Sequence, residues 1–225
     1  MLKKEKRIDI MVDIETLGVA LNSPIFQISA ACFDIDTGEI LEGYREETGY
    51  NKVIFDAYAD LSKEKNLNIN GGTLTWWIDK YPDMLRDILT RARDTKDCSR
   101  MYSRKSLIKA FSVFLQDIPK IFEVEEKDIY LWGNGVNFDN RLLKHQMDTY
   151  REELVNIKGI EFAGNSFLYP INYAREMDYR TILKIAAYKM GIPSRELRDK
   201  LLEEYKQINK EFNPHDAMED VLLQI

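Results

Sequence analysis

Alternating apolar and polar positions mark the first part of the chain as strands. Residues 8–15 alternate with a period of two, which predicts a β-strand. A second apolar segment spans residues 25–33, and residues 40–45 are predicted to pair with it as a hairpin. Residues 47–72 are polar and are expected to leave the sheet, whereas residues 129–132 predict one further buried strand.

From about residue 73, the spacing of apolar residues changes from that of a strand to that of a helix. Apolar residues over 74–81 recur at helical intervals, and Pro82 suits the first position of the next helix. Residues 91–105 are charged and predict a surface loop. Residues 106–115 predict a helix that ends before Pro119. Later helices are expected around residues 138–150, 178–190, 194–206 and 214–225. Early strands followed by helices with one inserted strand predict an α/β fold, with a mixed sheet flanked by helices.

Size and charge narrow the class of protein. The chain has 225 residues, with 38 acidic and 32 basic side chains and a net charge of -6, which predicts a single domain over residues 1–225. The acidic balance argues against a long electrostatic clamp on a duplex, although it is compatible with an enzyme that holds a few nucleotides. No apolar segment approaches the ~18 residues of a membrane span, so we expect no membrane partner. Two scattered cysteines and the lack of a secretory signal favour a cytoplasmic location.

The first strand ends in two acids. Asp13 and Glu15 are two positions apart, so both carboxylates project from the same face of the strand, roughly 6–7 Å apart. Two anions at this distance repel each other unless a cation lies between them. The alternative is a polar strand end with two solvated acids.

A second acid follows the later buried strand. Asn137 suits the N-cap of the next helix, which places Asp139 in its first turn. A negative charge is favoured there by the helix dipole, so Asp139 could serve that purpose alone. The sequence leaves both interpretations open.

The third group of polar residues precedes the last helix. Asp216 with Glu219 forms a capping box that would start the helix at Asp216. Asn213 as cap, with Pro214 as the first helical residue, is nearly as good. In the first case His215 lies on the loop just outside the helix and Asp220 on its first turn, where both could meet one site. The alternative is an exposed helix start.

Taken together, these residues indicate a metal site. Four carboxylates, Asp13, Glu15, Asp139 and Asp220, stand at a strand end or a helix start. Oxygen ligands suit Mg²⁺ or Mn²⁺, and two such ions ~3.5–4 Å apart can hold the attacking and leaving oxygens of a phosphoryl displacement. A neutral imidazole could take the proton of the attacking water, which makes His215 the candidate base.

In order and spacing, these motifs resemble the DEDDh class of DnaQ-like 3'-5' exonucleases. The motifs are Asp13-x-Glu15-Thr16, then Asn137-Phe138-Asp139, then His215 with Asp220 five positions later. Trp76-Trp77 and the segment 178–181 are also similar to features of the phage exonuclease A group and the related mycobacterial-type exoribonuclease domain. The resemblance implies a ribonuclease H-like fold, with a five-stranded mixed sheet and helices on both faces.

The resemblance also implies the roles of the acids. Asp13 would bridge two metal ions, and Glu15 and Asp220 would complete the more tightly held one. Asp139 would hold the second ion, and His215 would be the general base. The implied activity is metal-dependent hydrolysis of single-stranded DNA or RNA from the 3' end to nucleoside 5'-monophosphates.

Substrate contacts are expected beside the acids. The resemblance places Thr16 near the sugar and Leu17 against the base of the terminal nucleotide, and we assign Asn137 to the same group. Residues 91–105 are expected to be solvated, or otherwise to receive the trailing strand.

Two further side chains are assigned to substrate binding. Adjacent helical residues point ~100° apart, so one of Trp76 and Trp77 is expected in the core and the other could stack on a base. We assign the stacking position to Trp77. Arg180 could contact a phosphate or pair with Asp178.

Rival functions fit the sequence less well. An HD-type phosphohydrolase needs several histidines, and the chain has 2. A nucleic-acid-binding or polymerase-accessory proofreading module on the same fold remains the alternative. An inactive module would be expected to lose acids that repel phosphate, and all four are present, so we favour an enzyme.

Overall fold

A six-stranded mixed sheet forms the centre of the molecule. The computed structural model describes residues 6–45, 49–158, 166–210 and 212–225. The strand order is β6-β5-β2-β1-β7-β8. β2 is antiparallel to β1 and β5, β7 is parallel to β1 and β8, and β6 is parallel to β5. The strands are β1 (Ile8–Thr16), β2 (Ile25–Phe33), β5 (Ile54–Ala59), β6 (Arg100–Met101), β7 (Ile129–Gly133) and β8 (Glu176–Asp178).

The sheet therefore has six strands where five were expected, and the polar segment 47–72 contributes one of them. β5 lies within this segment, and its residues 54–58 pair with residues 27–31 of β2. Residues 40–45 were predicted to take that position. They are displaced from it, because one edge of β2 can pair with only one strand. Ile40 bridges to Phe33 and Leu41 N donates to Cys32 O over 2.8 Å. β3 (Glu42–Arg45) pairs with β4 (Gly49–Lys52) in a separate ribbon.

The helices follow the predicted order, but two of them are longer than predicted. The helix expected around residues 138–150 runs from residue 139 to residue 158. Pro82 begins its helix as predicted. The helix predicted for residues 106–115 runs to residue 122 and contains Pro119. A proline this close to the helix end removes one backbone hydrogen bond and leaves the earlier turns intact. The helices are α1 (Gly71–Lys80), α2 (Pro82–Arg91), α3 (Arg104–Phe122), α4 (Asp139–Lys158), α6 (Tyr179–Met190), α7 (Ser194–Ile208) and α8 (Ala217–Gln224).

Helices cover both faces of the sheet, and all nine residues of β1 are buried. One face of β1 presents Ile10 and Val12 to the main core, which includes Phe111 of α3 and Leu142 of α4. Met11, on the opposite face, packs in a second cluster with Val221 of α8. Because successive strand residues alternate faces, Asp13 and Glu15 project to the α8 side.

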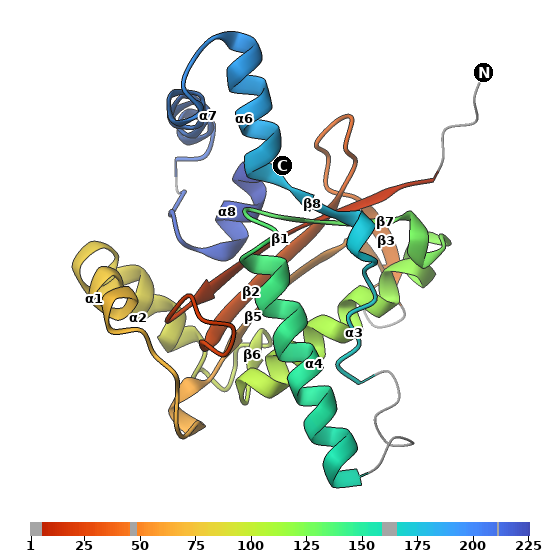
Figure 1. Ribbon diagram of the computed structural model, residues 1–225, viewed down its shortest axis with the longest axis vertical. Coiled ribbons are helices and arrows are strands. Elements are labelled where there is room, and N and C mark those ends of the chain that lie inside the picture. The colour runs from red at the N-terminus through yellow and green to blue at the C-terminus, as the bar shows by residue number, and fades with distance from the viewer. Residues whose placement is uncertain (1–5, 46–48, 159–165, 211) are drawn as a thin grey trace.

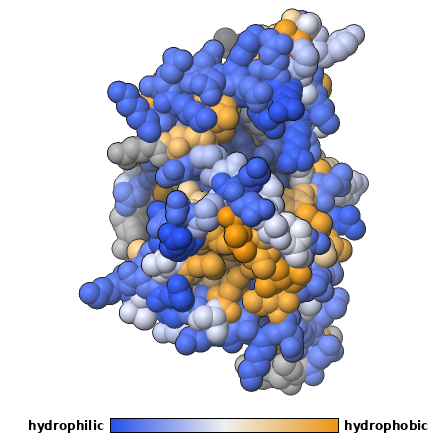
Figure 2. Space-filling view, turned by 90° about the vertical axis from the view of Figure 1, so that its left-hand side faces the viewer, coloured by the Kyte–Doolittle hydropathy of each residue, from blue (hydrophilic) through white to orange (hydrophobic). Residues whose placement is uncertain are grey.

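Two helical hairpins stand around the edge of this core. The α1–α2 hairpin closes over the end of β1 and β2 in a third apolar cluster, which includes Leu17, Phe26 and Trp77. The α6–α7 hairpin extends away from the sheet at the top of Figure 1. Seen from the side in Figure 2, the upper part of the molecule is mainly hydrophilic and apolar side chains gather below it. Within the described ranges, no helix is both long and apolar enough to cross a membrane.

Candidate active site

Asp13 and Glu15 are buried at the carboxyl end of β1. Each side chain belongs to a residue that is only 8% exposed. The pairing with β2 shifts register between Glu15 and Thr16, and such a bulge ends regular pairing beside a functional site. From α8, Gln224 Nε2 donates a hydrogen bond of 3.4 Å to Asp13 Oδ1. The last helix therefore contacts the first strand at these acids.

Asp139 is the first residue of α4 and is 3% exposed. Its Oδ2 atom is buried and has no hydrogen-bond partner among the residues that the structure describes. A Cβ atom at Gly133, at the end of β7, would lie 2.6 Å from Asn140 Oδ1 and 3.2 Å from Asp139 Oδ2. Glycine is thus required for the close approach of the α4 start to the sheet. The predicted N-cap role of Asn137 is wrong: Asn137 is an exposed turn residue two positions before the helix.

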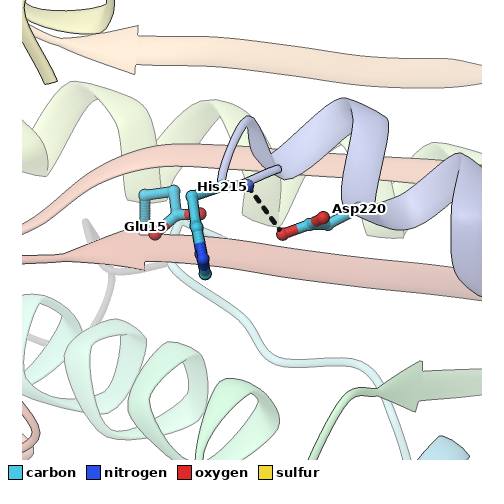
Figure 3. Close-up of side chains that lie close together, drawn as sticks. All are labelled: Glu15, His215 and Asp220. Atoms are coloured by element: carbon cyan, nitrogen blue, oxygen red, sulfur yellow. Dashed lines mark hydrogen bonds between the residues drawn. The ribbon is translucent and has the colours of Figure 1, made fainter. Parts of the chain in front are cut away.

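His215 and Asp220 stand at the start of α8. Asp216 is the N-cap and accepts a 3.0 Å hydrogen bond from Met218 N, so the alternative start at Asn213 is wrong. His215 has the left-handed φ of 67°, a conformation that a non-glycine residue adopts at a cost of order 1–3 kcal/mol. Its backbone N–H donates to Asp220 Oδ2 over 3.2 Å. Glu15, His215 and Asp220 offer ligand atoms that all lie within 4.8 Å of one another (Figure 3).

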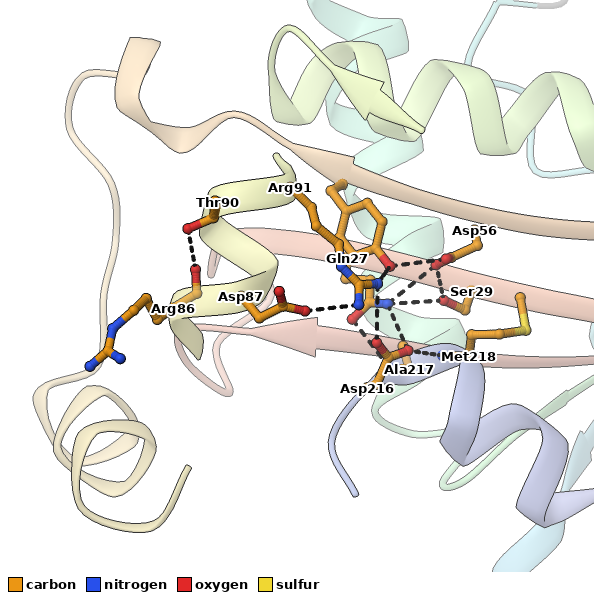
Figure 4. Close-up of polar contacts among 11 residues, drawn as sticks. Gln27, Ser29, Asp56, Arg86, Asp87, Thr90, Arg91, Asp216, Ala217 and Met218 are labelled. Atoms are coloured by element: carbon orange, nitrogen blue, oxygen red, sulfur yellow. Dashed lines mark hydrogen bonds and ion pairs between the residues drawn. The ribbon is translucent and has the colours of Figure 1, made fainter. Parts of the chain in front are cut away.

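A buried polar network holds the start of α8 against β2 (Figure 4). Gln27 of β2 donates from Nε2 to Asp216 Oδ1 and accepts from Ala217 N, both over 3.2 Å. The guanidinium of Arg91, on α2, lies 3.7 Å from Asp216 Oδ2. Gln27 also donates to Asp56 Oδ1 on β5 over 3.2 Å. Since each bond crosses between elements, the network sets the position of the helix that carries Asp220.

Aromatic rings surround the imidazole of His215. The centroid of its ring lies 4.2 Å from that of Tyr81 and 4.9 Å from that of Trp76. Trp77 is 1% exposed, and its indole N–H donates to Thr16 O over 3.1 Å. Its assignment to base stacking is therefore wrong, because its ring is part of the core. Trp76 is the exposed member of the pair, at 40%. The sequence reasoning missed Tyr81 as a neighbour of His215, although its helical spacing from Trp77 was recognised.

Thr16 and Leu17 lie next to the acids but expose little surface. The Thr16 hydroxyl donates to Gly18 O over 2.5 Å. The exposed fractions of Thr16 and Leu17 are 6% and 5%, and Leu17 packs in the third apolar cluster. Only a small part of either side chain is available to a nucleotide.

Arg180 lies at the rim of the site and is exposed. Its Nε donates to Asn134 Oδ1 over 3.3 Å. Asp178 instead caps α6, where it accepts from Thr181 N over 2.7 Å and from Val136 N over 3.0 Å. The geometry therefore leaves the guanidinium of Arg180 near the acids and beside Gly135.

The acids share an excess of negative charge. Burial, with the nearby Asp139 and Asp220, raises the pKa of Asp13 well above its ordinary value. Burial, with Asp13 as the main charged neighbour, raises the pKa of Glu15 in the same way. Burial raises the pKa of Asp139 and of Asp220 to about 7, although Arg180 opposes the shift at Asp139. Repulsion of this kind is relieved when a cation enters.

The donor set suits a hard divalent cation. Buried carboxylates supply oxygen ligands, and Asp139 Oδ2 is a buried acceptor that has no hydrogen-bond partner within the described residues. One imidazole is the only nitrogen side chain in the converging group of Glu15, His215 and Asp220, within the part of the chain that the structure describes. Carboxylate oxygens are ligands that hard divalent cations take in proteins. The residues present therefore fit a divalent metal.

Comparison with known proteins places the chain in a family. The family model described as 3'-5' exoribonuclease Rv2179c-like domain matches residues 8–225. The crystal structure of cell-death related nuclease 4 (CRN-4) is similar at a TM-score of 0.50 and 16% identity, over 96% of this chain and 60% of that chain. The zinc-bound Escherichia coli ExoI–ssDNA complex is similar at a TM-score of 0.49 and 16% identity, over 98% of this chain and 39% of that chain.

The chain thus spans less than two thirds of either nuclease. No curated protein sequence matches. At this level of identity, the similarity to CRN-4 shows a shared fold, which confirms the predicted ribonuclease H-like fold apart from the number of strands.

Proposed function

Because the chain belongs to the family of 3'-5' exoribonuclease Rv2179c-like domains, within the DnaQ-like exonucleases, we propose that it shortens single-stranded nucleic acid from the 3' end and releases nucleoside 5'-monophosphates. The observation that carries the proposal is the convergence of Glu15, His215 and Asp220 within 4.8 Å, from the first strand and the last helix. A binding module would gain nothing from buried acids that repel phosphate.

Four acids would hold the metal. Asp13, Glu15, Asp139 and Asp220 would bind two Mg²⁺ or Mn²⁺ ions, with Asp13 shared between them. When bound, such ions polarise the phosphate and lower the pKa of a bound water. Asp139 and Asp220, with pKa values of about 7, would lose their remaining protons on binding. Metal affinity should therefore rise with pH through the neutral range.

His215 would take the proton from the attacking water. Burial lowers its pKa below the ordinary value, so the imidazole is neutral at neutral pH and able to accept a proton. Tyr81 and Trp76 limit the movement of the ring. The hydrogen bond from its backbone to Asp220 ties the base to an acid of the metal site.

The terminal nucleotide would lie beside Thr16 and Leu17, with Asn137 and Arg180 at the rim. The exposed face of Trp76, in place of Trp77, would stack on a base, which in single-strand binders is worth ~1–3 kcal/mol per base. The Escherichia coli ExoI complex contains single-stranded DNA, whereas the family description names an exoribonuclease. The proposed substrate class is single-stranded nucleic acid of either sugar.

The test is digestion of matched DNA and RNA oligonucleotides with one end blocked. We expect metal-dependent release of mononucleotides when the 5' end is blocked, and none when the 3' end is blocked. Release that depends on a free 5' end would refute the polarity. Binding without release in Mg²⁺ and in Mn²⁺ would favour the alternative, a catalytically weak binding or polymerase-accessory module.

The metal-free protein is expected to become less stable as pH rises. The pKa values of Asp13, Glu15, Asp139 and Asp220 are raised by folding, so these groups bind more protons in the folded chain than in the unfolded one. Their contribution to stability is present below the unfolded pKa near 4 and is lost as pH rises through about 7. His215, whose pKa is lowered, contributes in the opposite sense but is one group against four.

The measurement is the melting temperature in a chelator, compared with the melting temperature in excess Mn²⁺. Each kcal/mol lost between about pH 5.5 and pH 8 would lower it by roughly 2–4 °C in a chain of this size. Mn²⁺ should raise it more at the higher pH than at the lower one. An equal Mn²⁺ effect at both values would show that these acids do not bind the ion.

A further inference from the structure

A hollow of about 500 Å³ opens beside the acids, between the α6–α7 hairpin and α8. Its inner end is lined by His215, Asp220 and Gln224, and Arg180 stands where the hollow joins the site. Its outer part runs between α6 and α7, in the mainly hydrophilic upper part of the molecule. We call this hollow the basic groove.

Basic side chains line the basic groove, although the chain as a whole is acidic. Arg180 and Lys184 of α6 face Arg195 and Arg198 of α7, and Asp220 is the one acid of its lining within the described residues. The net charge of the chain is -6. A local excess of positive charge in an acidic protein is an electrostatic attractor for a polyanion.

The two sides of α7 differ in charge. Leu201 and Leu202 line the basic groove with the two arginines. A separate hollow on the other side of the helix is lined by Glu196, Asp199, Lys200, Glu203 and Glu204, with Arg195 at the boundary. Asp199 pairs with Arg198 over 3.1 Å and with Arg195 over 3.9 Å. Such exposed pairs are weak and leave a guanidinium able to meet a phosphate.

Apolar and aromatic side chains complete the groove. Leu183, Phe212 and Tyr179 lie in its lining beside the cations. Single-strand binders combine these two features, since the cations follow the backbone while apolar and aromatic surfaces receive the bases.

We propose that the basic groove holds the backbone of the nucleotides on the 5' side of the scissile bond and guides the strand toward Glu15, His215 and Asp220. The inference rests on the proposed function, because the strand that occupies the groove is the one whose 3' end lies at the acids. The cations also offset the repulsion that four carboxylates exert on an approaching phosphate chain.

The experiment compares two substrates, a 12-mer that reaches the groove and a dinucleotide that does not. Arg195→Gln with Arg198→Gln should lower the preference for the 12-mer, measured as the ratio of the two kcat/KM values, by about tenfold at an ionic strength of ~0.1 M. Two lost phosphate contacts should also reduce the slope of log affinity against log salt by about 1.4, since each contact to a single strand contributes about 0.7.

The matched control is Lys200→Gln with Lys206→Gln, which removes the same charge from α7 away from the groove. In this control the ratio should stay within about twofold of the unaltered chain. The reason is that the electrostatic effect of an exposed charge on a distant phosphate is screened over ~10 Å. Equal ratios in the two double variants would overturn the proposal.

A binding measurement separates this inference from the proposed function. Fluorescence anisotropy of a labelled 12-mer in a chelator reports the groove without cleavage. If the unaltered chain cleaves neither substrate, the proposed function fails, while weaker binding by the Arg195→Gln, Arg198→Gln variant still supports the groove. If it cleaves both and the variant binds as tightly as the control, the groove fails and the proposed function stands.

Discussion

Replacing Asp13 by asparagine is expected to reduce exonuclease turnover by at least about 10³-fold, more than the 10–100-fold loss typical of an outer partner of a metal ligand. Asp13 is buried among the acids, and Asp139 and Asp220 are the main charged groups that raise its pKa. A neutral amide at this position would remove the ligand proposed to be shared between two ions. The measurement is release of mononucleotides in excess Mn²⁺.

The same substitution should stabilise the metal-free protein. Removing one buried negative charge relieves the repulsion that raises the pKa values of Glu15 and its neighbours. We therefore expect a higher melting temperature in a chelator and a smaller increase on adding Mn²⁺. The two effects together distinguish a lost metal ligand from a damaged fold, which would lower both activity and stability.

The control for this prediction is Asp83→Asn. Asp83 has a side chain that is 91% exposed and pairs with Arg86 on the surface of α2. This change should leave turnover and the Mn²⁺ effect within experimental error. If Asp13→Asn kept turnover within about threefold of the unaltered chain, the metal scheme would be wrong, since the ions that Asp13 would hold supply the transition-state charge stabilisation.

Replacing His215 by alanine is expected to lower the rate by about 10²–10⁴-fold, the usual contribution of a general base. The imidazole must be neutral to act, and burial lowers its pKa below the ordinary value. With Mn²⁺ at saturating concentration, so that metal binding does not limit the rate, the rate of the unaltered chain should therefore rise with pH on the acid side of about 6.5 and level off above it. The alanine variant should lose this dependence.

A ligand role for His215 predicts a different result. Its ring nitrogen lies within 4.8 Å of oxygens of Glu15 and Asp220, so loss of the imidazole could weaken metal binding instead. The two roles separate in the Mn²⁺-dependent rise in melting temperature, which a base leaves in place and a ligand does not. His145→Ala is the control, because His145 lies six positions after Asp139 on α4 and outside the group of Glu15, His215 and Asp220. A loss below about tenfold in His215→Ala would require another base.

The periodicity of the chain predicted most of the elements, because burial of one face leaves a repeated mark on the sequence. The residues of β1, β2 and β7 and the order of the later helices were predicted in this way. β5 was missed because its mainly apolar residues stand within the longer polar segment 47–72. In addition, Asp56 and Tyr58 of β5 take part in a polar network, in which Asp56 accepts from Ser29 and from Tyr58. Its place in the sheet depends on its pairing with β2, and the local sequence pattern carries no information about this long-range contact.

The sequence identified the acids and the histidine that could carry chemistry, but it did not show that they lie close together in the fold. Asp13, Glu15 and Asp139 each stand at an element end, where an acid also has an ordinary structural explanation. The sequence left the start of α8 ambiguous. In the structure, Gln27 donates a hydrogen bond to Asp216, which is 189 positions away in the sequence. Trp76 and Trp77 were indistinguishable by composition, and only the packing of Trp77 under Thr16 decided which ring is exposed.

The sequence by itself determined the chemistry that this chain has to offer: carboxylates and one imidazole at the ends of predicted elements, in an order similar to that of a nuclease family. The tertiary structure decided which of them share one charge environment, because pKa shifts and ligand distances arise from contacts between β1, α4 and α8. It also decided which basic side chains lie beside that site, since the groove between α6 and α7 exists only after these helices pack. Short-range periodicity records burial, whereas the meeting of distant residues is set by the fold as a whole.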